Sequence, residues 1–406
     1  MGYKNRRVVV TGLGIVSSIG IGWRDFWQNL IKGKSGISKI TSFDTKEYDR
    51  HFGGEVKDFK PEEFIDRRKI KRMGRSSQLA VSASKLALED ARLKIKDIAK
   101  QRAGVCVGTT MGESQLMEHM DRIWTTRGDK YIDSMHIFLY PTSIIPTEIA
   151  QEFKLHANNL IFSNACAAGN YSIGYAFDLI KNERADLMLA GGVDAFSRIN
   201  FVGFGRLYAI APEICQPFDK NRKGMLVSEG AGMLVLESLE SALKRKAPIY
   251  AEILGYGLSC DAYQMTTASV EGVAECLKKS LRESNIKPED VDYISAHGTG
   301  TPTNDKVECA AIKNVFKNYK KIPISSIKSM LGHTMGAAAA IEAIVCCLTI
   351  KNGIIPPTIN YETADPNCDI DCVPNEARKQ TVNIALNNSQ AFGGNNACVV
   401  LRKFVR

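Results

Sequence analysis

A cysteine stands where a short apolar run gives way to a helical pattern. Residues 159–162 predict a buried strand, and Ile173, Phe177 and Ile180 recur at the spacing of one helix face. Cys166 therefore lies on a tight turn between strand and helix, with small residues around it. Only a thiolate attacks a carbonyl, and the N-terminus of a helix stabilises an anion. The pattern indicates a nucleophile, with a buried structural cysteine as the alternative.

Two histidines follow predicted strands and are flanked by glycines. His297 opens the segment His-Gly-Thr-Gly-Thr-Pro, and His333 lies in Leu-Gly-His-Thr-Met-Gly. An imidazole can transfer a proton or donate a hydrogen bond to a developing oxygen anion. Lys328, five residues before His333, would add a fixed positive charge, and a surface lysine is the alternative. A single histidine is usually structural, but two such turns together with a cysteine turn favour a catalytic set.

Strands and helices alternate along the chain, which predicts an α/β architecture. The pattern of a strand followed by a helix begins again near residue 250. There residues 249–254 predict a strand and residues 270–284 an amphipathic helix. Similar endings, Leu-Ile-Lys-Asn at 179–182 and Thr-Ile-Lys-Asn at 349–352, indicate a weak internal duplication. We predict an N-terminal half, 1–249, with the cysteine, and a C-terminal half, 250–406, with both histidines and the lysine.

Two further segments carry local predictions. Residues 11–17, Thr-Gly-Leu-Gly-Ile-Val-Ser, predict a turn after a first strand and lack the third glycine of a dinucleotide loop. Residues 113–158 predict an irregular region that lines or caps a site.

Composition indicates the cellular compartment of the protein and the kind of partner that it binds. The chain has 53 basic and 44 acidic residues, and a net charge of +9 favours an acidic partner but is too dispersed to indicate nucleic acid. Eleven cysteines without a repeating framework predict free thiols in a reducing, cytoplasmic compartment, and the Cys368–Cys372 spacing has no second pair to form a metal site. We expect no membrane span, because the apolar run 337–350 is short and contains Glu342.

Four motifs in one order resemble the elongating β-ketoacyl-acyl-carrier-protein synthases, and also the active ketosynthase subunit of type II polyketide systems. They are Asn-Ala-Cys-Ala-Ala-Gly at 164–169, His-Gly-Thr-Gly-Thr-Pro at 297–302, Lys-Ser-Met-Leu-Gly-His at 328–333, and Phe-Gly-Gly-Asn-Asn at 392–396. The resemblance covers essentially the whole chain. It implies a thiolase fold, in which two similar halves form five layers, αβαβα, and a dimer with the active site near the interface.

The resemblance also implies a reaction. Cys166 would take an acyl group from the phosphopantetheine thioester of an acyl carrier protein. Malonyl-carrier protein would then lose carbon dioxide, and the carbanion would attack the acyl-cysteine and lengthen the chain by two carbons. His297 and His333 would promote decarboxylation and stabilise the enolate oxygen. No bound cofactor is expected.

Supporting roles are implied in the same way. Lys328 would order the site with Asp305 and Glu308 as partners, and the backbone N–H groups of Cys166 and Phe392 would form an oxyanion hole. The implied substrate-binding residues are Thr299 and Thr301 for the phosphopantetheine arm, and Met111, Phe204, Phe392 and Gly393 around the acyl group. In the basic stretch 64–75, Arg68, Lys71 and Arg72 match the family's docking positions for the acidic carrier protein, with a solvated helix face as the alternative.

One loop departs from the family pattern. Fatty-acid synthases usually have Ser-Phe-Gly-Phe-Gly-Gly, whereas this chain has Ser-Gln-Ala-Phe-Gly-Gly at 389–394. Because this loop gates the acyl pocket in the family, the change favours a specialised polyketide or polyene pathway, in which a chain-length-factor subunit would form a heterodimer. The alternatives are a homodimeric synthase II of housekeeping fatty-acid elongation and a non-catalytic chain-length partner, which would lack the nucleophile.

Overall fold

The computed structural model describes residues 6–405, and its main sheet repeats one topology twice. The sheet has eleven strands in the order β11-β10-β14-β15-β9-β1-β8-β7-β5-β6, with β2 beside β1. The first half contributes β1 (Val8–Ser17), β5 (Ala103–Gly108), β6 (Asn159–Phe162), β7 (Leu187–Asp194) and β8 (Gly230–Ser238). The second contributes β9 (Ala251–Cys260), β10 (Tyr293–Ser295), β11 (Ile324–Ser325), β14 (Ile384–Gln390) and β15 (Asn395–Arg402).

The two halves match strand for strand. When the five strands of each half are numbered in chain order, both halves read 3-2-4-5-1 across the sheet. In both halves the first three strands of this order pair in parallel and the last two join in antiparallel fashion. The halves meet where β1 pairs with β9 over three residues, Val8–Val10 with Ala251–Ile253. The predicted duplication is confirmed, whereas the boundary after residue 249 stays a prediction.

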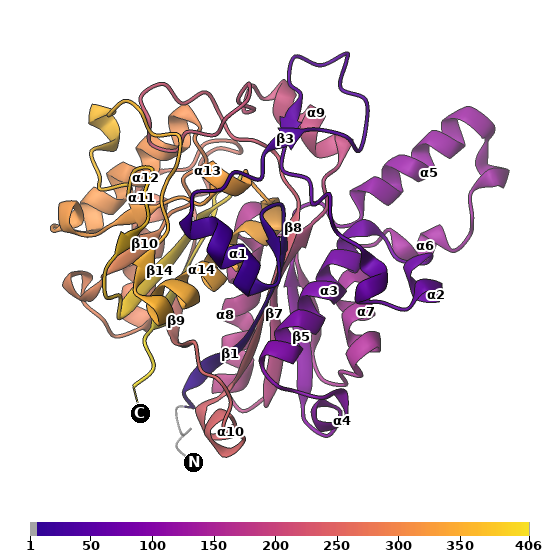
Figure 1. Ribbon diagram of the computed structural model, residues 1–406, viewed down its shortest axis with the longest axis horizontal. Helices are drawn as coiled ribbons and strands as arrows, with labels where there is room; N and C mark the ends of the chain where they lie inside the picture. The colour runs from indigo at the N-terminus through magenta and orange to yellow at the C-terminus, as the bar shows by residue number, and fades with distance from the viewer. Residues whose placement is uncertain (1–5, 406) are drawn as a thin grey trace.

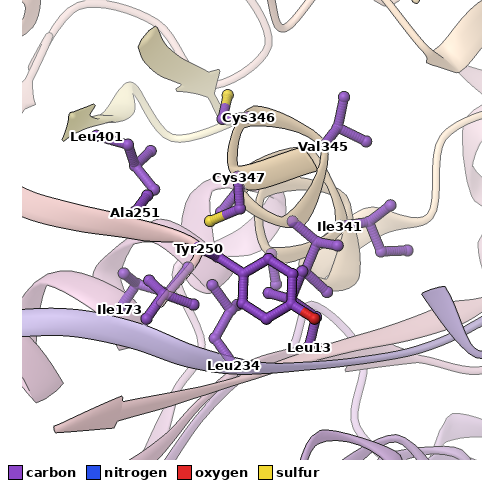
Figure 2. Close-up of a cluster of buried hydrophobic side chains, with 14 of the residues drawn as sticks. Leu13, Ile173, Leu234, Tyr250, Ala251, Ile341, Val345, Cys346, Cys347 and Leu401 are labelled. Carbon is purple, nitrogen blue, oxygen red and sulfur yellow. The ribbon is translucent and has the colours of Figure 1, made fainter. Parts of the chain in front are cut away.

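Helices complete five layers (Figure 1). The outer face of the first half is covered by α3 (Arg75–Asp90) and α7 (Ile144–Phe153), and that of the second by α11 (Val270–Glu283) and α12 (Pro302–Val315). Between the halves lie α8 (Ala168–Lys181) and α14 (Ala338–Asn352), which contact strands of both. Figure 2 shows the resulting core, where Ile341 and Val345 of α14 and Ile173 of α8 meet side chains from strands of both halves. The thiolase fold predicted from the motifs is therefore confirmed.

The remaining elements are short or peripheral. The helices are α1 (Trp23–Ile31), α2 (Arg67–Ile70), α4 (Ile95–Ile98), α5 (Ser114–Arg127), α6 (His136–Leu139), α9 (Arg198–Arg206), α10 (Leu239–Lys244) and α13 (Lys328–Leu331). The strands are β2 (Gly20–Ile21), β3 (Ser38–Lys39), β4 (Phe52–Gly53), β12 (Ile354–Ile355) and β13 (Arg378–Lys379). Single-turn 3-10 helices η3 (Ala165–Ala167) and η6 (Met335–Ala337) precede the two central helices.

Helix α14 is apolar on all sides because protein surrounds it. Together with η6 it gives a run of 18 residues, Met335–Asn352, that by length and composition could cross a membrane, so the expectation that no run is long enough was wrong. However, 89% of this run is buried inside the protein. Such a pattern is typical of a helix at the centre of a large core.

The arm at residues 113–158 is helical, which corrects the prediction of an irregular region. It contains α5, α6 and α7, and α5 projects from the body of the molecule (Figure 1). Large apolar side chains are exposed along α5, α6 and their connection: Met117, Trp124, Tyr131, Met135, Ile137, Phe138 and Tyr140. We call these seven residues the apolar arm. An exposed patch of this kind is typical of a surface that another chain covers.

Strand β1 runs straight through the segment 11–17, for which the sequence predicted a turn. The glycines there serve close packing, since a Cβ atom on Gly14 would lie 1.8 Å from the carbonyl oxygen of Ala83 in α3. A Cβ atom on Gly12 would lie 2.2 Å from the carbonyl oxygen of Ala87. Glycine at these positions lets the helix backbone lie directly on the strand.

We predict that Gly14→Ala lowers the free energy of unfolding by about 1–3 kcal/mol, because the new methyl group forces α3 away from β1. Urea denaturation followed by circular dichroism measures this loss. Gly203→Ala in α9 is the matched control: a Cβ atom there meets nothing within 4 Å, so this change should be neutral or stabilising. Equal stability of the two variants would contradict the packing argument.

Candidate active site

Two equivalent turns open the central helices. Turn η3 leads into α8, and turn η6 leads into α14. Ala165 and Met335, the first residues of these turns, have φ angles of 47° and 53°, a left-handed conformation that residues other than glycine seldom adopt. Cys166 is the second residue of its turn, and Gly336 holds the same place in the other. The duplicated turn therefore carries a thiol in the first half only, at the N-terminal end of α8.

A buried carboxylate fixes the second turn. Asp194, at the end of β7, accepts hydrogen bonds from the backbone N–H groups of Gly336 at 2.6 Å and Met111 at 2.9 Å, and from the hydroxyl of Thr109 at 2.8 Å. It ties the loop after β5 to η6. Sequence reasoning did not single out Asp194, because its partner Gly336 lies 142 residues away along the chain.

The two histidines predicted from the motifs lie together. The ring centroids of His297 and His333 are 5.3 Å apart at an interplanar angle of 81°, and the residues are 4% and 2% exposed. The Nδ1 atom of His333 accepts a hydrogen bond from the backbone N–H of Met335 at 3.1 Å, so a neutral His333 carries its proton on Nε2. Among residues 6–405, Nδ1 of His297 has no hydrogen-bond partner.

Both imidazoles and the thiol of Cys166 line one cavity of about 270 Å³. The tertiary structure thus brings together three motifs that are far apart in sequence. Cys166 is 7% exposed and packs with Ala167, Ala391 and Ala397. Small neighbours leave room for a carbonyl group beside the sulfur.

Burial sets the protonation states of these three groups. Desolvation, with the nearby charge of Lys328, holds the pKa of His297 and of His333 well below the usual 6.5, so both rings are neutral at pH 7. Burial raises the pKa of the Cys166 thiol to about 12, and Lys328 opposes the rise. The free protein therefore holds a protonated thiol, not the thiolate expected from the helix N-terminus alone. A neutral imidazole beside it can accept the proton.

Lys328 is buried and pairs with Glu342 of α14. Burial raises the pKa of Glu342 to about 7, while the ammonium group of Lys328 acts to lower it. In the sequence, Glu342 stands out only as a charge that interrupts an apolar run. A carboxylate inside an otherwise apolar helix was the signal that could have identified it as a partner.

Asp305 and Glu308 do not pair with Lys328, which corrects the partners that we expected. Glu308 accepts hydrogen bonds from the backbone N–H groups of His297 and Gly298, each at 2.8 Å. Asp305 accepts one from the N–H of Gly300 at 3.2 Å. Both carboxylates come from α12 and hold the backbone of the turn that follows His297.

The residues expected to bind substrate separate into two groups. Thr299, Thr301, Phe204 and Phe392 line the cavity. The hydroxyl oxygens of the two threonines are 2.9 Å apart, and the two phenylalanine rings are 5.9 Å apart.

Met111 and Gly393 are not among the residues that line the cavity. The backbone N–H of Met111 is bonded to Asp194, and that of Gly393 donates to the carbonyl oxygen of Met265 at 2.7 Å. These bonds fix the backbone of the neighbouring loops, and the role of both residues in binding substrate stays a prediction.

The basic residues near α2 form a separate surface feature. Arg68, Lys71 and Arg72 are exposed, and the Arg68 side chain is 91% exposed and pairs with Asp66 at 3.2 Å. Within the described part of the chain, no group of three or more His, Cys, Asp or Glu side chains is arranged to hold a metal ion.

Comparison with known families matches both halves of the chain. The sequence model described as Beta-ketoacyl synthase, N-terminal domain, matches residues 5–242, and that described as Beta-ketoacyl synthase, C-terminal domain, matches residues 250–362. The chain belongs to the beta-ketoacyl synthase family. It is accordingly a ketosynthase, an enzyme of the acyltransferase class.

Relatives of this ketosynthase match over its whole length. A protein of Synechocystis sp. named 3-oxoacyl-[acyl-carrier-protein] synthase 2 is 40% identical, with 99% of each chain covered. One of the same name from Staphylococcus aureus is 39% identical with the same coverage.

Two solved structures are similar as well. The ishigamide ketosynthase/chain length factor is 44% identical with a TM-score of 0.95, over 99% of this chain and 100% of that chain. The second is a structure of a type II PKS acyl-carrier protein in complex with its ketosynthase. Its matching chain is 35% identical with a TM-score of 0.91, over 99% of this chain and 100% of that chain.

We predict that Lys328→Met lowers the free energy of unfolding by about 3–5 kcal/mol at pH 8, because it leaves the Glu342 carboxylate buried without a counter-charge. The loss should shrink toward pH 6. Without Lys328 the pKa of Glu342 rises further, so the folded variant keeps a proton that the unfolded chain releases, and its stability falls as pH rises.

Urea denaturation at pH 6, 7 and 8 measures this dependence. The control is the double variant Lys328→Met/Glu342→Gln, which removes both charges and should recover most of the stability at pH 8. A loss that is equal at all three pH values would contradict the ion-pair explanation.

Proposed function

We propose that this ketosynthase catalyses a decarboxylative Claisen condensation, in which malonyl-acyl carrier protein extends an acyl group held on Cys166 by two carbons. The observation that carries the assignment of residues is that one thiol and two neutral imidazoles line a single cavity. A neutral imidazole can take a proton through one nitrogen and donate a hydrogen bond through the other, and the chemistry needs both.

In the first step the sulfur of Cys166 attacks the thioester carbonyl of the acyl-carrier protein. The thiol proton passes to a neutral imidazole and then to the departing thiolate of the phosphopantetheine arm. The tetrahedral oxyanion is held by the backbone N–H groups of Cys166 and Phe392. Among residues 6–405 neither of these N–H groups has a protein acceptor, so both are available to the substrate.

In the second step the malonyl group loses carbon dioxide, and the electron pair of the broken bond becomes an enolate. His333 donates only through Nε2–H, because its Nδ1 is occupied by Met335, and it therefore suits an enolate oxygen. His297 is the second donor. Lys328 acts as a positioning residue: burial lowers the pKa of both rings, and the charge of Lys328 lowers it further.

In the third step the enolate carbon attacks the acyl-cysteine carbonyl. The carbon–sulfur bond breaks, and the expelled Cys166 thiolate takes up one proton from solvent water, which a neutral imidazole can relay. The phosphopantetheine arm of the carrier protein delivers the substrates, with Thr299 and Thr301 as its hydrogen-bonding partners on the cavity wall. These steps need no other cofactor.

Two partners follow from the surface. The exposed cations Arg68, Lys71 and Arg72 suit the acidic surface of a carrier protein. The apolar arm suits a second subunit, either another copy or a chain-length factor. All eleven cysteines are free in the described structure, which supports a cytoplasmic location.

The favoured setting is a specialised type II polyketide or polyene pathway. The 44% identity to the ishigamide ketosynthase/chain length factor and the unusual Gln390-Ala391 pair in the gating loop support it. Housekeeping fatty-acid elongation is the alternative, favoured by the 40% identity to a 3-oxoacyl-[acyl-carrier-protein] synthase 2.

We predict that Cys166→Ala abolishes condensation, by about 10³-fold or more, because no acyl-enzyme can form. Intact-protein mass spectrometry after incubation with acyl-carrier protein should show the acyl mass on the unaltered protein only. Decarboxylation of malonyl-carrier protein should persist in the variant, since both histidines remain. Cys260→Ala, which removes an exposed thiol, is the control and should still be acylated. Acylation of Cys166→Ala would contradict the assigned nucleophile.

We predict that Arg68→Glu raises the Kd for the carrier protein about tenfold at low salt and less at 0.5 M salt, because salt screens exposed charges. Lys46→Glu is the matched control: Lys46, like Arg68, is exposed and pairs with an aspartate two residues before it. Fluorescence anisotropy with a labelled carrier protein measures both. Equal effects of the two variants on the Kd would contradict the assignment of α2 as the docking site.

A further inference from the structure

Gln390 has a buried amide group without partners in the wall of the active-site cavity. It is the last residue of β14, is 1% exposed, and lines the cavity together with Cys166, His297 and His333. Among residues 6–405, neither the amide nitrogen nor the amide oxygen of Gln390 has a hydrogen-bond partner. A buried amide in this state is disfavoured, and such groups in folded proteins call for an explanation.

The amide nitrogens of neighbouring side chains on the same strand are bonded, whereas the amide oxygens of Asn387 and Asn388 have no partner among residues 6–405. The side-chain nitrogen of Asn388 donates to Glu308 at 2.7 Å, and that of Asn387 donates to the side-chain oxygen of Asn170 at 2.9 Å. Gln390 has the same chemistry but no such contact. The fold therefore supplies partners for the amide nitrogens along β14 except at the position that faces the cavity.

The neighbours of Gln390 along the chain contact the residues that support the reacting groups. Side chains two apart on a strand share a face about 6.6 Å apart, so Gln390 follows Asn388, which bonds to the carboxylate that holds His297. On its other side, Ala391 packs against Cys166. In the chain, Gln390 is therefore flanked by one residue that supports the His297 turn and one that packs against the nucleophile. The hydroxyls of Thr299 and Thr301 pair with each other elsewhere on the wall.

We infer that Gln390 determines substrate specificity: its amide binds an oxygen on the β-carbon of the acyl chain, so the enzyme takes 3-oxoacyl or 3-hydroxyacyl thioesters in preference to saturated chains. This inference rests on the proposed function of the cavity. A site built to hydrogen-bond a substrate oxygen rejects the analogue that lacks it, because the buried polar group of the protein is then left unpaired. The first carbons of an acyl group on Cys166 lie in the cavity whose wall includes Gln390.

The experiment is a competition between two chains of equal length. The protein is incubated with an equimolar mixture of 3-hydroxyoctanoyl-carrier protein and octanoyl-carrier protein, and the initial rates of acylation of Cys166 are read by intact mass. We expect at least a tenfold preference for the 3-hydroxyoctanoyl chain. In Gln390→Met, which keeps a long unbranched side chain and removes the amide, the ratio should fall close to one.

Ser82→Ala is the matched control. Ser82 lies in α3, and its hydroxyl is buried and lacks a partner like the Gln390 amide, but it does not line the cavity. This variant should keep the preference of the unaltered protein. Loss of the preference in Ser82→Ala would show that selectivity follows general core polarity, and would overturn the inference.

Other outcomes separate the inference from the proposed function. Equal acylation by both chains in the unaltered protein would overturn the inference alone, and this result needs no variant to fold. Equal slowing of both chains in Gln390→Met would place the amide on the shared phosphopantetheine arm or in a structural role, and would also overturn it. If neither chain acylated Cys166 in the unaltered protein, the proposed function itself would fail and the inference with it.

Discussion

The close approach of the two central helices is the constraint on which the site depends. A Cβ atom on Gly169 of α8 would lie 2.7 Å from the backbone nitrogen of Ala340 in α14, so only glycine permits this contact. A Cβ atom on Gly192, at the end of β7, would lie 2.2 Å from the carbonyl oxygen of Gly336. These contacts bring turn η3 beside turn η6. The thiol of one half and the histidine of the other consequently share one cavity.

Enclosure of this junction by the strands of both halves explains its electrostatics. A group between α8 and α14 is far from water, so every charge there needs a partner. Lys328 and Glu342 provide one such pair, and Asp194 is held by backbone N–H groups. Burial lowers the pKa of both imidazoles, so they stay neutral. The same burial that keeps the Cys166 thiol protonated also keeps the two imidazoles unprotonated, so that they can accept its proton.

The two ends of the segment 390–392 have different surroundings. Phe392 is 39% exposed and lies against the ring of Phe204, whereas Gln390 is buried in the wall. The segment thus joins a half-open aromatic contact to a fixed polar residue. We expect the aromatic pair to control entry to the cavity and the amide to control which chain is retained. Chain selection would then be separate from the chemistry at Cys166, because it uses different side chains.

The sequence alone determined the fold and predicted the residues that the proposed reaction uses. The strand before Cys166, the small residues after it and the glycine-flanked histidines are short-range patterns, and short-range patterns specify turns between strands and helices. The halves, the α/β class and the cavity residues Thr299, Thr301, Phe204 and Phe392 followed from the same motifs.

Tertiary structure alone decided which side chains pair with one another. Lys328 pairs with Glu342 and not with Asp305 or Glu308, because α14 passes beside α13 while α12 holds the His297 turn. The glycines of β1 proved to permit helix packing, which no local pattern distinguishes from a turn. The unpaired amide of Gln390 became visible only when its surroundings were known. Contacts of this kind depend on which elements lie side by side, and the sequence near each residue does not contain that information.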